Sequence, residues 1–585
     1  MMMTAGRMLA GDIYVSATGG SDANDGTVSR PLQTLEMAFR QAREWRRLGS
    51  DKANGGINIV LRGGVYSLSS TLMLRPEDSG TPTSPTVVRS FEGEKAVISG
   101  GIEVSGWRQG CDDERVPARL RDSIWVSDAP RVGNKIVYTR QLWVDNAKAM
   151  MAKQFGEGVM ERMTDFNTAG RTITIPTPDV DLSAADQLEM TVHQRWAIAI
   201  LRVRQMISDG QGNTIVSFHE PESRLEFEHP WPQPVIGGER GNSSFFLSNA
   251  AELLDEPGEW WQDYPSGRIY YYPKGGDMQS HSAVIPVLET LIDVNGSRER
   301  RVGNIKFVNV AFEHAAWYQP SLQGHVTLQG GFSLIDAYKL AEPGLPHKAE
   351  LENQAWIKRP EAAVKVSFGD AIDFDGCTFA HIGNCGLDYV RSANGSSVSG
   401  CTFTDIGGTA IQAGSFPDMG FETHIPYIPV VADEICDSLT FKGNTIYDAT
   451  NEDWGCVGIG AGYVRNILIE GNDVSKVNYS GICVGWGWTA LMSGMSDNVI
   501  RGNYVHDYAR QLYDAGGIYT LSNQPNSFIV HNRISAPFNA PYATNERGFC
   551  IYFDEATDGF TVEENDCEKT EFGYNKPGPS MVVKP

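Results

Sequence analysis

The sequence predicts an all-β protein built as a parallel β-helix, a solenoid that carries an inserted β-rich domain in its N-terminal half. The first observation is a repeat in the last third of the chain. There, an apolar residue, two spacers and then Asn or Cys recur every 24 to 43 residues. This period is typical of stacked repeats, and Asn at one phase indicates a ladder of side chains bonded from coil to coil. The seven instances are Phe374 to Cys377, Val398 to Cys401, Phe441 to Asn444, Ile469 to Asn472, Ile500 to Asn503, Ile529 to Asn532 and Val562 to Asn565.

The second observation is a strand that follows each ladder position and opens with a small residue. Strands recurring at one phase should stack into one parallel sheet, with coils about 4.8 Å apart. Most residues of this sheet are small or apolar, so acidic side chains at its border stand out. The exposed face of such a rod suits an extended polymer. The series is Gly386-Leu387-Asp388-Tyr389, Ala410-Ile411-Gln412, Val457-Gly458-Ile459, Gly481-Ile482-Cys483-Val484, Gly517-Ile518-Tyr519-Thr520 and Phe549-Cys550-Ile551-Tyr552.

Residues 12–107 are predicted to start the rod with short strands and one amphipathic helix. Leu35, Ala38, Phe39 and Ala42 follow helical spacing. This helix would cap the open end of the first coil, as solenoids require.

Residues 108–285 lose the rhythm of the rod and hold isolated strands with many aromatic residues, which predicts an inserted β-rich domain. From residue 286 to 585 the main β-helix is expected, with regular coils to about residue 567. Within it, residues 320–360 break the rhythm and are predicted to form a loop. The tail, residues 574–585, shows no repeat.

The amino-acid composition argues against some classes of binding partner. The net charge is −23, and no Lys/Arg run supplies a basic surface, which argues against nucleic acid and against anionic membranes. No apolar stretch approaches the roughly 18 residues of a membrane span, and the N-terminus lacks the apolar core of a signal peptide. A neutral polysaccharide or oligosaccharide is compatible with this balance.

Four of the nine cysteines, and one acidic turn, are expected to be structural. Cys377, Cys401, Cys456 and Cys483 fall at repeat phases that point inward, so free buried thiols are predicted. No CxxC is present, which argues against a zinc or redox site. No cofactor is expected, although the turn Ser21 to Gly26 has acidic oxygens that could hold a structural calcium ion.

Two aspartates are the candidate catalytic residues. Asp514 lies in QLYDAGGIYT and Asp554 in IYFDEATDGF, so each follows an aromatic residue and belongs to a neighbouring coil. Glycoside hydrolysis uses two carboxyls about 5–9.5 Å apart, one as acid and the other as base or nucleophile. A carboxyl beside aromatic rings can have a raised pKa, which suits the acid.

The register of the two coils decides whether these acids meet. Asp514 and Asp554 would occupy equivalent positions in neighbouring coils if residues 535–547 bulge out by about one turn. If instead Gly517 pairs with Gly548, the acids lie at opposite ends of a strand and could not share one bond. The simpler alternative is that each Asp caps a turn.

Other residues are candidates for binding the substrate. Trp486 and Trp488 in VGWGWT are expected on one side of a strand, where they stack on sugars or pack under a loop. His506, beside Asp507, could bind a hydroxyl, although a structural His is an alternative. Tyr519 and Tyr552 are assigned to substrate binding from their place in the sheet.

Glu555 and Asp388 are two further candidate acids besides Asp514 and Asp554. Glu555 adjoins Asp554, and neighbouring strand residues point to opposite faces, so Glu555 is assigned to binding rather than catalysis. Asp388 lies in an apolar strand and is a third candidate acid, or an Asp bonded within the ladder.

Four stretches together resemble glycoside hydrolase family 141, a group of right-handed parallel β-helix proteins from bacteria with α-L-fucosidase and xylanase activities. They are YVSATGGSDANDGTVSRPLQTLEMA, LRPEDSGTPTSPTVVRSFEGEKAVISGGIEVSGW, SGICVGWGWT, and DAGGIYTLSNQP followed by IYFDEATDGFTVEEN. The resemblance implies two catalytic Asp in contexts that match Asp514 and Asp554. It also implies a secreted or periplasmic protein. The related glycoside hydrolase family 120, which contains β-xylosidases, is similar as well.

The leading hypothesis is therefore a glycoside hydrolase that cleaves a plant or algal polysaccharide or its side chains, with α-L-fucosides or xylan and xylosides as substrates. A polysaccharide lyase or uronate epimerase is an alternative, but these enzymes need Lys or Arg to neutralise the uronate. A non-catalytic carbohydrate-binding rod would show aromatic stripes without paired acids, and the fold alone does not choose between these functions.

Overall fold

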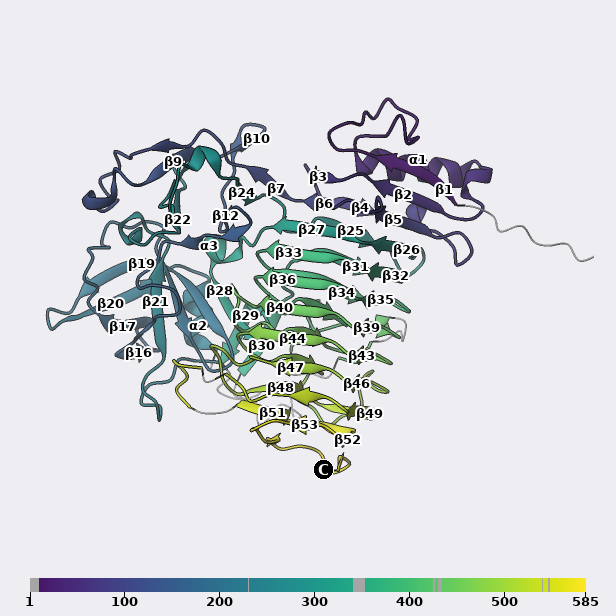
Figure 1. Cartoon of the computed structure of the whole chain (residues 1–585). Helices are drawn as coiled ribbons and strands as arrows, with labels where there is room; N and C mark the ends of the chain where they lie inside the picture. Colours follow the sequence, from purple (N-terminus) through teal and green to yellow (C-terminus); the bar gives the residue numbers. More distant parts are fainter. Residues whose placement is uncertain are drawn as a thin grey trace, which may run out of the picture.

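The computed structural model describes residues 10–229, 231–339, 353–423, 427–429, 434–538, 540–545 and 548–584. A rod of stacked coils forms one side of the molecule and a β-rich lobe lies against it (Figure 1). Along each regular coil the chain passes through three long parallel sheets in turn. The predicted all-β parallel β-helix is confirmed.

The first sheet runs the length of the rod and holds the strand that precedes each ladder position. Its strands are β1 (Gly11–Val15), β2 (Ile57–Leu61), β5 (Thr86–Ser90), β26 (Val302–Val308), β32 (Gly369–Asp375), β35 (Ser397–Ser399), β39 (Thr440–Lys442), β43 (Leu468–Glu470), β46 (Val499–Arg501), β49 (Asn523–Val530), β52 (Asp558–Glu563) and β55 (Val582–Val583).

The second sheet follows the ladder position in each coil. Its strands are β3 (Gly64–Ser67), β6 (Ala96–Ser99), β27 (Val310–Ala315), β33 (Thr378–Ile382), β36 (Thr402–Ile406), β40 (Thr445–Ala449), β44 (Asp473–Val477), β47 (Tyr504–His506), β50 (Arg533–Ile534) and β53 (Asp566–Cys567).

The third sheet contains the predicted series of strands that open with a small residue, and all six pair in one parallel sheet as expected. Its strands are β4 (Leu72–Leu74), β25 (Ile292–Asn295), β31 (Ala362–Ser367), β34 (Cys385–Arg391), β37 (Ile411–Ala413), β41 (Ile459–Ala461), β45 (Ile482–Val484), β48 (Ala515–Thr520), β51 (Gly548–Phe553) and β54 (Gly573–Tyr574).

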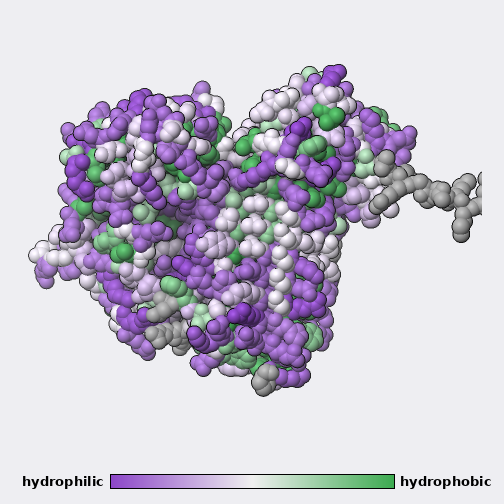
Figure 2. Space-filling view, viewed as in Figure 1, coloured by the Kyte–Doolittle hydropathy of each residue, from purple (hydrophilic) through white to green (hydrophobic). Residues whose placement is uncertain are grey.

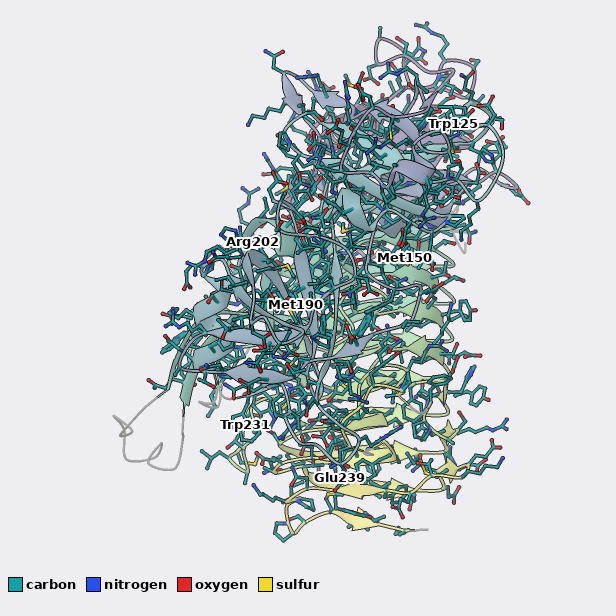
Figure 3. The ribbon with its side chains drawn as sticks, turned by 90° about the vertical axis from the view of Figure 1, so that its left-hand side faces the viewer. Trp125, Met150, Met190, Arg202, Trp231 and Glu239 are labelled. Carbon is teal, nitrogen blue, oxygen red and sulfur yellow. A yellow bond between two sulfur atoms is a disulfide. The ribbon has the colours of Figure 1, made fainter. Side chains whose placement is uncertain are left out.

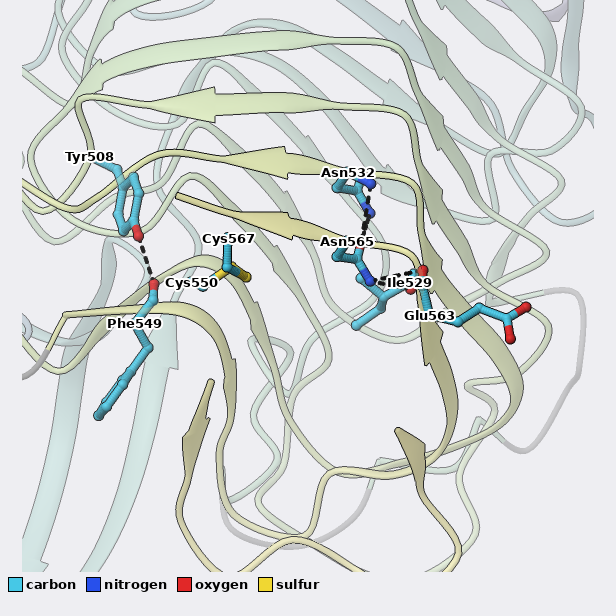
Figure 4. The surroundings of a disulfide bond; sticks show 8 residues. All are labelled: Tyr508, Ile529, Asn532, Phe549, Cys550, Glu563, Asn565 and Cys567. Carbon is cyan, nitrogen blue, oxygen red and sulfur yellow. Dashed lines mark hydrogen bonds between the residues drawn. A yellow bond between two sulfur atoms is a disulfide. The ribbon is translucent and has the colours of Figure 1, made fainter. Parts of the chain in front are cut away.

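The Asn ladder is confirmed at the corner between the first two sheets. Asn444, Asn472, Asn503 and Asn532 are buried, and the amide of each donates to the side-chain oxygen of the next ladder Asn at 2.9 Å. The same amide also donates to a backbone carbonyl of an earlier coil. Figure 4 shows the step from Asn532 to Asn565. A buried amide costs free energy unless bonded, and here each coil bonds the next.

The helix at the start of the rod is also confirmed. Helix α1 (Leu35–Arg47) buries Leu35, Ala38, Phe39 and Ala42 against the first coil. In the acidic turn ahead of it, the Asp22 carboxylate accepts hydrogen bonds from the backbone of Gln33 and Thr34. No cluster of three His, Cys, Asp or Glu is found in the described part of the chain, and structural calcium stays a prediction.

The lobe begins where the chain leaves the rod after β7 (Gly101–Glu103) and ends where it returns at β25. Figure 3 looks onto the lobe, with Met150, Met190 and Arg202 labelled on its strands. It contains β8 (Arg108–Gln109), β9 (Trp125–Asp128), β10 (Arg131–Val132), β11 (Lys135–Ile136), β12 (Trp143–Val144), β13 (Ala147–Lys148), β14 (Met150–Met151), β15 (Glu161–Arg162), β16 (Asp165–Asn167), β17 (Thr172–Pro176), β18 (Glu189–His193), β19 (Ile198–Ser208), β20 (Asn213–Phe218), α2 (Glu222–Glu228), β21 (Ser244–Ser248), β22 (Glu259–Asp263), β23 (Arg268–Tyr271) and β24 (Ala283–Pro286).

The loop predicted for residues 320–360 is wrong where the structure describes it. This segment contributes helix α3 (Gln319–Gln323) and strands β28 (His325–Gln329), β29 (Phe332–Lys339) and β30 (Asn353–Lys358). Strand β28 pairs with β19, so the segment extends the sheet of the lobe instead of adding a coil to the rod. The pair Gly330-Gly331 between two short strands is typical of a β-hairpin, and it does not follow the periodicity of the rod.

The tail also departs from expectation, because it forms one more coil. Strand β54 pairs with β51, and β55 pairs with β52. A disulfide between Cys550 and Cys567, with Cα atoms 5.7 Å apart, ties β51 to β53 (Figure 4). The four predicted thiols are free: Cys377, Cys401 and Cys456 are buried, and Cys483 is half-buried.

Hydrophilic residues cover most of the face of the molecule seen in Figure 2. In the described residues, no helix has both the length and the apolarity needed to cross a membrane.

Candidate active site

One row of outward-pointing side chains on the third sheet organises the candidate site. Because strand residues alternate between faces, the core takes Ile411, Ile459 and Ile482, and the residue after each points away from the core. In the middle of this row, small residues leave a hollow between larger neighbours. In register, the row reads Lys365, Asp388, Gln412, Gly460, Cys483, Tyr519 and Tyr552.

The hollow is a pocket between the rod and the lobe. Its floor is Gln412, Gly460 and Cys483, and Tyr479 and Tyr519 close one end. The hairpin of β28 and β29 supplies Gln329, Gly330 and Phe332, while Phe416, Val457, Ala461, Gly485, Trp486 and Leu521 complete the lining. None of the described lining residues carries a charged side chain, so the pocket suits a neutral ligand.

The register between β48 and β51 contradicts the in-phase expectation for the two acids. Ala515 pairs with Gly548, so Asp514 precedes one strand while Asp554 follows the other. The described residues between β50 and β51 form no strand, but inward-facing Ile518 and Ile551 pair directly and fix the register. A slip of one residue would turn these core side chains outward.

Two tyrosines join the acids across this distance. The Tyr552 hydroxyl donates to Oδ1 of Asp514 at 3.1 Å, and the Tyr519 hydroxyl donates to Oδ2 of Asp554. The two tyrosine rings pack edge to face, with centroids 5.3 Å apart. Each strand's tyrosine therefore reaches the acid carried by the other strand.

A third tyrosine, which the sequence did not single out, lies between the same acids. The hydroxyl of buried Tyr479 donates to the backbone carbonyl of Asp514 at 3.1 Å. Burial raises the pKa of Tyr479 well above its ordinary value, and nearby acidic groups, Asp514 and Asp554 among them, add to the rise. Both carboxylates thus act on one phenol at the end of the pocket.

Asp554 has the environment of a carboxyl that can hold a proton. Burial raises the pKa of Asp554 above its ordinary value, and the hydrogen bond from Tyr519 opposes part of the rise. Asn575, from the tail, donates to its other oxygen at 2.7 Å. Glu555 instead accepts a hydrogen bond from Lys576 at 3.1 Å.

The predicted tryptophan pair does not lie on a strand. β45 ends at Val484, because Gly485 and Gly487 adopt positive φ angles of 119° and 102°. Trp486 is 4% exposed and packs against Phe332 and Phe416, with ring centroids 5.1 and 5.0 Å away. Packing under a neighbouring loop, the alternative interpretation, is therefore what the structure shows for Trp486. Trp488 lies beside it at 5.0 Å and is half-buried.

Two other candidate residues, His506 and Asp388, lie outside the group of side chains that surrounds Asp514 and Asp554. His506 is on β47 of the second sheet, where it bonds Asp473 at 3.1 Å and stacks on Tyr504. Asp388 lies in the outward row but is fully buried, with its carboxylate bound by Arg359 at 2.8 and 2.9 Å. Asp388 therefore forms a structural ion pair.

Comparisons with known proteins agree with this architecture. The family model of the glycoside hydrolase family 141 insertion domain matches residues 122–274, within the lobe, and a model of the right-handed β-helix region matches residues 430–575. A solved structure described as a glycoside hydrolase is 39% identical, covers 98% of this chain and 96% of its own, and superposes with a TM-score of 0.93.

The chain belongs to glycoside hydrolase family 141. The right-handed parallel β-helix and the carbohydrate-active class implied by the resemblance are thereby confirmed. Among curated proteins, pectate lyase PEL9 of Emericella nidulans is 40% identical over 93 residues, 16% of this chain and 19% of that protein. YwoF of Bacillus subtilis is 34% identical over 91 residues, 16% of each chain. These matches span less than a fifth of either curated relative.

Proposed function

We propose that this member of family 141 hydrolyses α-L-fucosides, or xylan and xylosides, in plant or algal polysaccharides or their side chains, with Asp514 and Asp554 as catalytic carboxyls. The observation that carries the proposal is the tyrosine pair that links both acids at one end of an uncharged pocket. Although Asp514 and Asp554 lie at opposite ends of the paired strands, the two tyrosines connect their carboxyl groups, and cleavage of a glycosidic bond uses two such carboxyls.

The environments of Asp554 and Asp514 favour a different catalytic role for each carboxyl. Because burial raises the pKa of Asp554, this carboxyl keeps its proton to higher pH and suits the general acid that protonates the leaving oxygen. Asp514 then acts as the base or nucleophile. Activity should fall as the pH rises through the pKa of Asp554, since the acid must be protonated to donate.

The character of the pocket favours a neutral sugar over a uronate. Phe332, Phe416 and Trp486 offer apolar surface, and none of the described lining residues brings a positive charge. Arg359, beside two of these rings, already binds Asp388 and Asp418.

A polysaccharide lyase is the second candidate, on the strength of the short match to a pectate lyase. It would need a cation for the uronate carboxylate. It would also release unsaturated, ultraviolet-absorbing products instead of reducing sugar alone.

A substrate screen tests the proposal. Aryl α-L-fucosides, aryl β-xylosides and plant polysaccharides are assayed with the full chain, and products are checked for unsaturation. Asp514→Asn and Asp554→Asn should each lower kcat about a hundredfold or more while the circular dichroism spectrum is unchanged. Full activity in either variant would refute the assignment of that residue, and unsaturated products would select the lyase.

A further inference from the structure

The tip of the hairpin between β28 and β29 is built to fit against the rod. Gly330 and Gly331 have φ angles of 60° and 82°, as a two-residue hairpin turn needs. A Cβ atom on Gly331 would lie 2.3 Å from Sγ of Cys456, so only Gly allows this approach.

The hairpin is also held at its base. His325 Nε2 lies 2.8 Å from Oδ2 of Asp453 on the rod, and both side chains are 3% exposed. Within the lobe, Trp196 Nε1 donates to the carbonyl of Leu328 at 2.9 Å. Gln329, between this contact and the glycine turn, is thus fixed in place and 8% exposed.

Gln329 contacts the hydrogen-bond chain that ends on Asp554. Its amide Nε2 donates to the hydroxyl oxygen of Tyr519 at 3.1 Å. An amide N–H can only donate, so the hydroxyl accepts this bond and its own hydrogen is directed elsewhere. The partner of that hydrogen is Oδ2 of Asp554.

We propose that Gln329 is a positioning residue of the active site, whose amide fixes the hydroxyl of Tyr519 with its hydrogen on Asp554. The catalytic meaning of this contact rests on the proposed function. Both acids and all three tyrosines come from the rod, whereas Gln329 comes from the lobe. The hairpin thus lines the pocket and also sets the direction of a hydrogen bond to a catalytic carboxyl.

The sign of the effect follows from the form of Asp554 that the bond favours. A donor to a carboxylate stabilises the charged form and lowers its pKa, so losing that donor raises the pKa of Asp554. The titratable groups around Asp554 are the phenols of Tyr519 and Tyr479 and the carboxylate of Glu555, which pairs with Lys576. Gln329 acts on Asp554 through Tyr519 alone.

The test measures the titration of Asp554 directly. Its carboxyl stretching band is isolated by subtracting infrared spectra of the matching protein that also carries Asp554→Asn. Tyr519→Phe should raise the pKa of Asp554, and Gln329→Leu should raise it by less. The double variant should titrate like Tyr519→Phe alone. Gln323→Leu, an exposed glutamine on α3 of the same lobe, is the matched control and should titrate like the wild type.

Activity gives a second readout on whichever aryl glycoside the wild type hydrolyses. Gln329→Leu should lower kcat about three- to tenfold, the range of one hydrogen bond. An unchanged titration in Gln329→Leu, or a shift that adds in full to that of Tyr519→Phe, would overturn the proposal. If Asp554→Asn kept full activity, the proposed function would fail while the infrared titration still decided whether Gln329 acts through Tyr519.

Discussion

An aspartate lies beyond each end of the pocket on the third sheet, and the two are held by different partners. At one end, Asp388 is fully buried and bound by Arg359, with Gln412 donating to the same carboxylate at 3.1 Å. At the other end, Asp554 receives its hydrogen bonds from Tyr519 and Asn575, which are neutral donors. Between them lies the uncharged pocket.

This difference separates a structural acid from the proposed catalytic acid. Burial raises the pKa of both carboxyls, but at Asp388 the guanidinium of Arg359 opposes that rise by its charge, so Asp388 takes part in an ion pair that stabilises the fold. Neutral donors leave burial free to raise the pKa of Asp554, which makes proton donation possible. The same residue type therefore has a different environment at each end of the pocket.

The largest effect on stability is expected at the Asp388 end. Arg359→Met removes one partner of a buried ion pair, and should destabilise the protein by about 3–5 kcal/mol. Arg501→Met, at an arginine with a 48% exposed side chain that pairs with Glu470, is the control and should cost at most about 1 kcal/mol. Urea denaturation measures both, and a smaller loss in Arg359→Met than in the control would contradict the structural role.

At the Asp554 end, a covalent bond holds the last coils. The disulfide of Cys550 and Cys567 spans 17 residues, and its loss should cost about 3 kcal/mol. Cys550→Ser/Cys567→Ser should therefore unfold at lower denaturant than Cys111→Ser, which removes a free thiol. Equal midpoints for the two proteins would show that the disulfide contributes little to this end of the rod.

The pH dependence sharpens the comparison further. With a raised pKa, Asp554 contributes stability that is present at low pH and lost as the pH rises through its folded pKa. Asp554→Asn should therefore unfold at the same temperature as the wild type or higher above that pH, although its activity is lost. Thermal melts across pH 4–9 check this, and a clearly lower melting temperature in Asp554→Asn at every pH would argue against a raised pKa.

Sequence predicts the parts of this molecule that repeat. The Asn ladder, the strands of the third sheet and the capping helix follow from periodicity, because each coil buries the same positions. The acids and two of the tyrosines follow from their similar contexts in neighbouring coils. The register of those coils does not follow, since it depends on how Ile518 and Ile551 pair in the core.

Contacts between segments that are distant in the sequence could not be predicted from the sequence either. Gln329 belongs to a hairpin that pairs with the lobe, and its role depends on a turn seated against Cys456. Asn575 lies in a tail whose strands are only two residues long, which is too short for a pattern. Trp486 has a clear motif, but two glycines with positive φ move it off the strand.

The most direct test places one substitution at each end of the pocket. Asp554→Asn and Asp388→Asn are compared by kcat on the same aryl glycoside, with kcat normalised to the folded fraction. We expect Asp554→Asn to lose about a hundredfold or more, and Asp388→Asn to remain within about threefold of the wild type while melting at a lower temperature. Equal losses of kcat in both variants, or a greater loss in Asp388→Asn, would contradict the assignment of Asp554 as the catalytic acid.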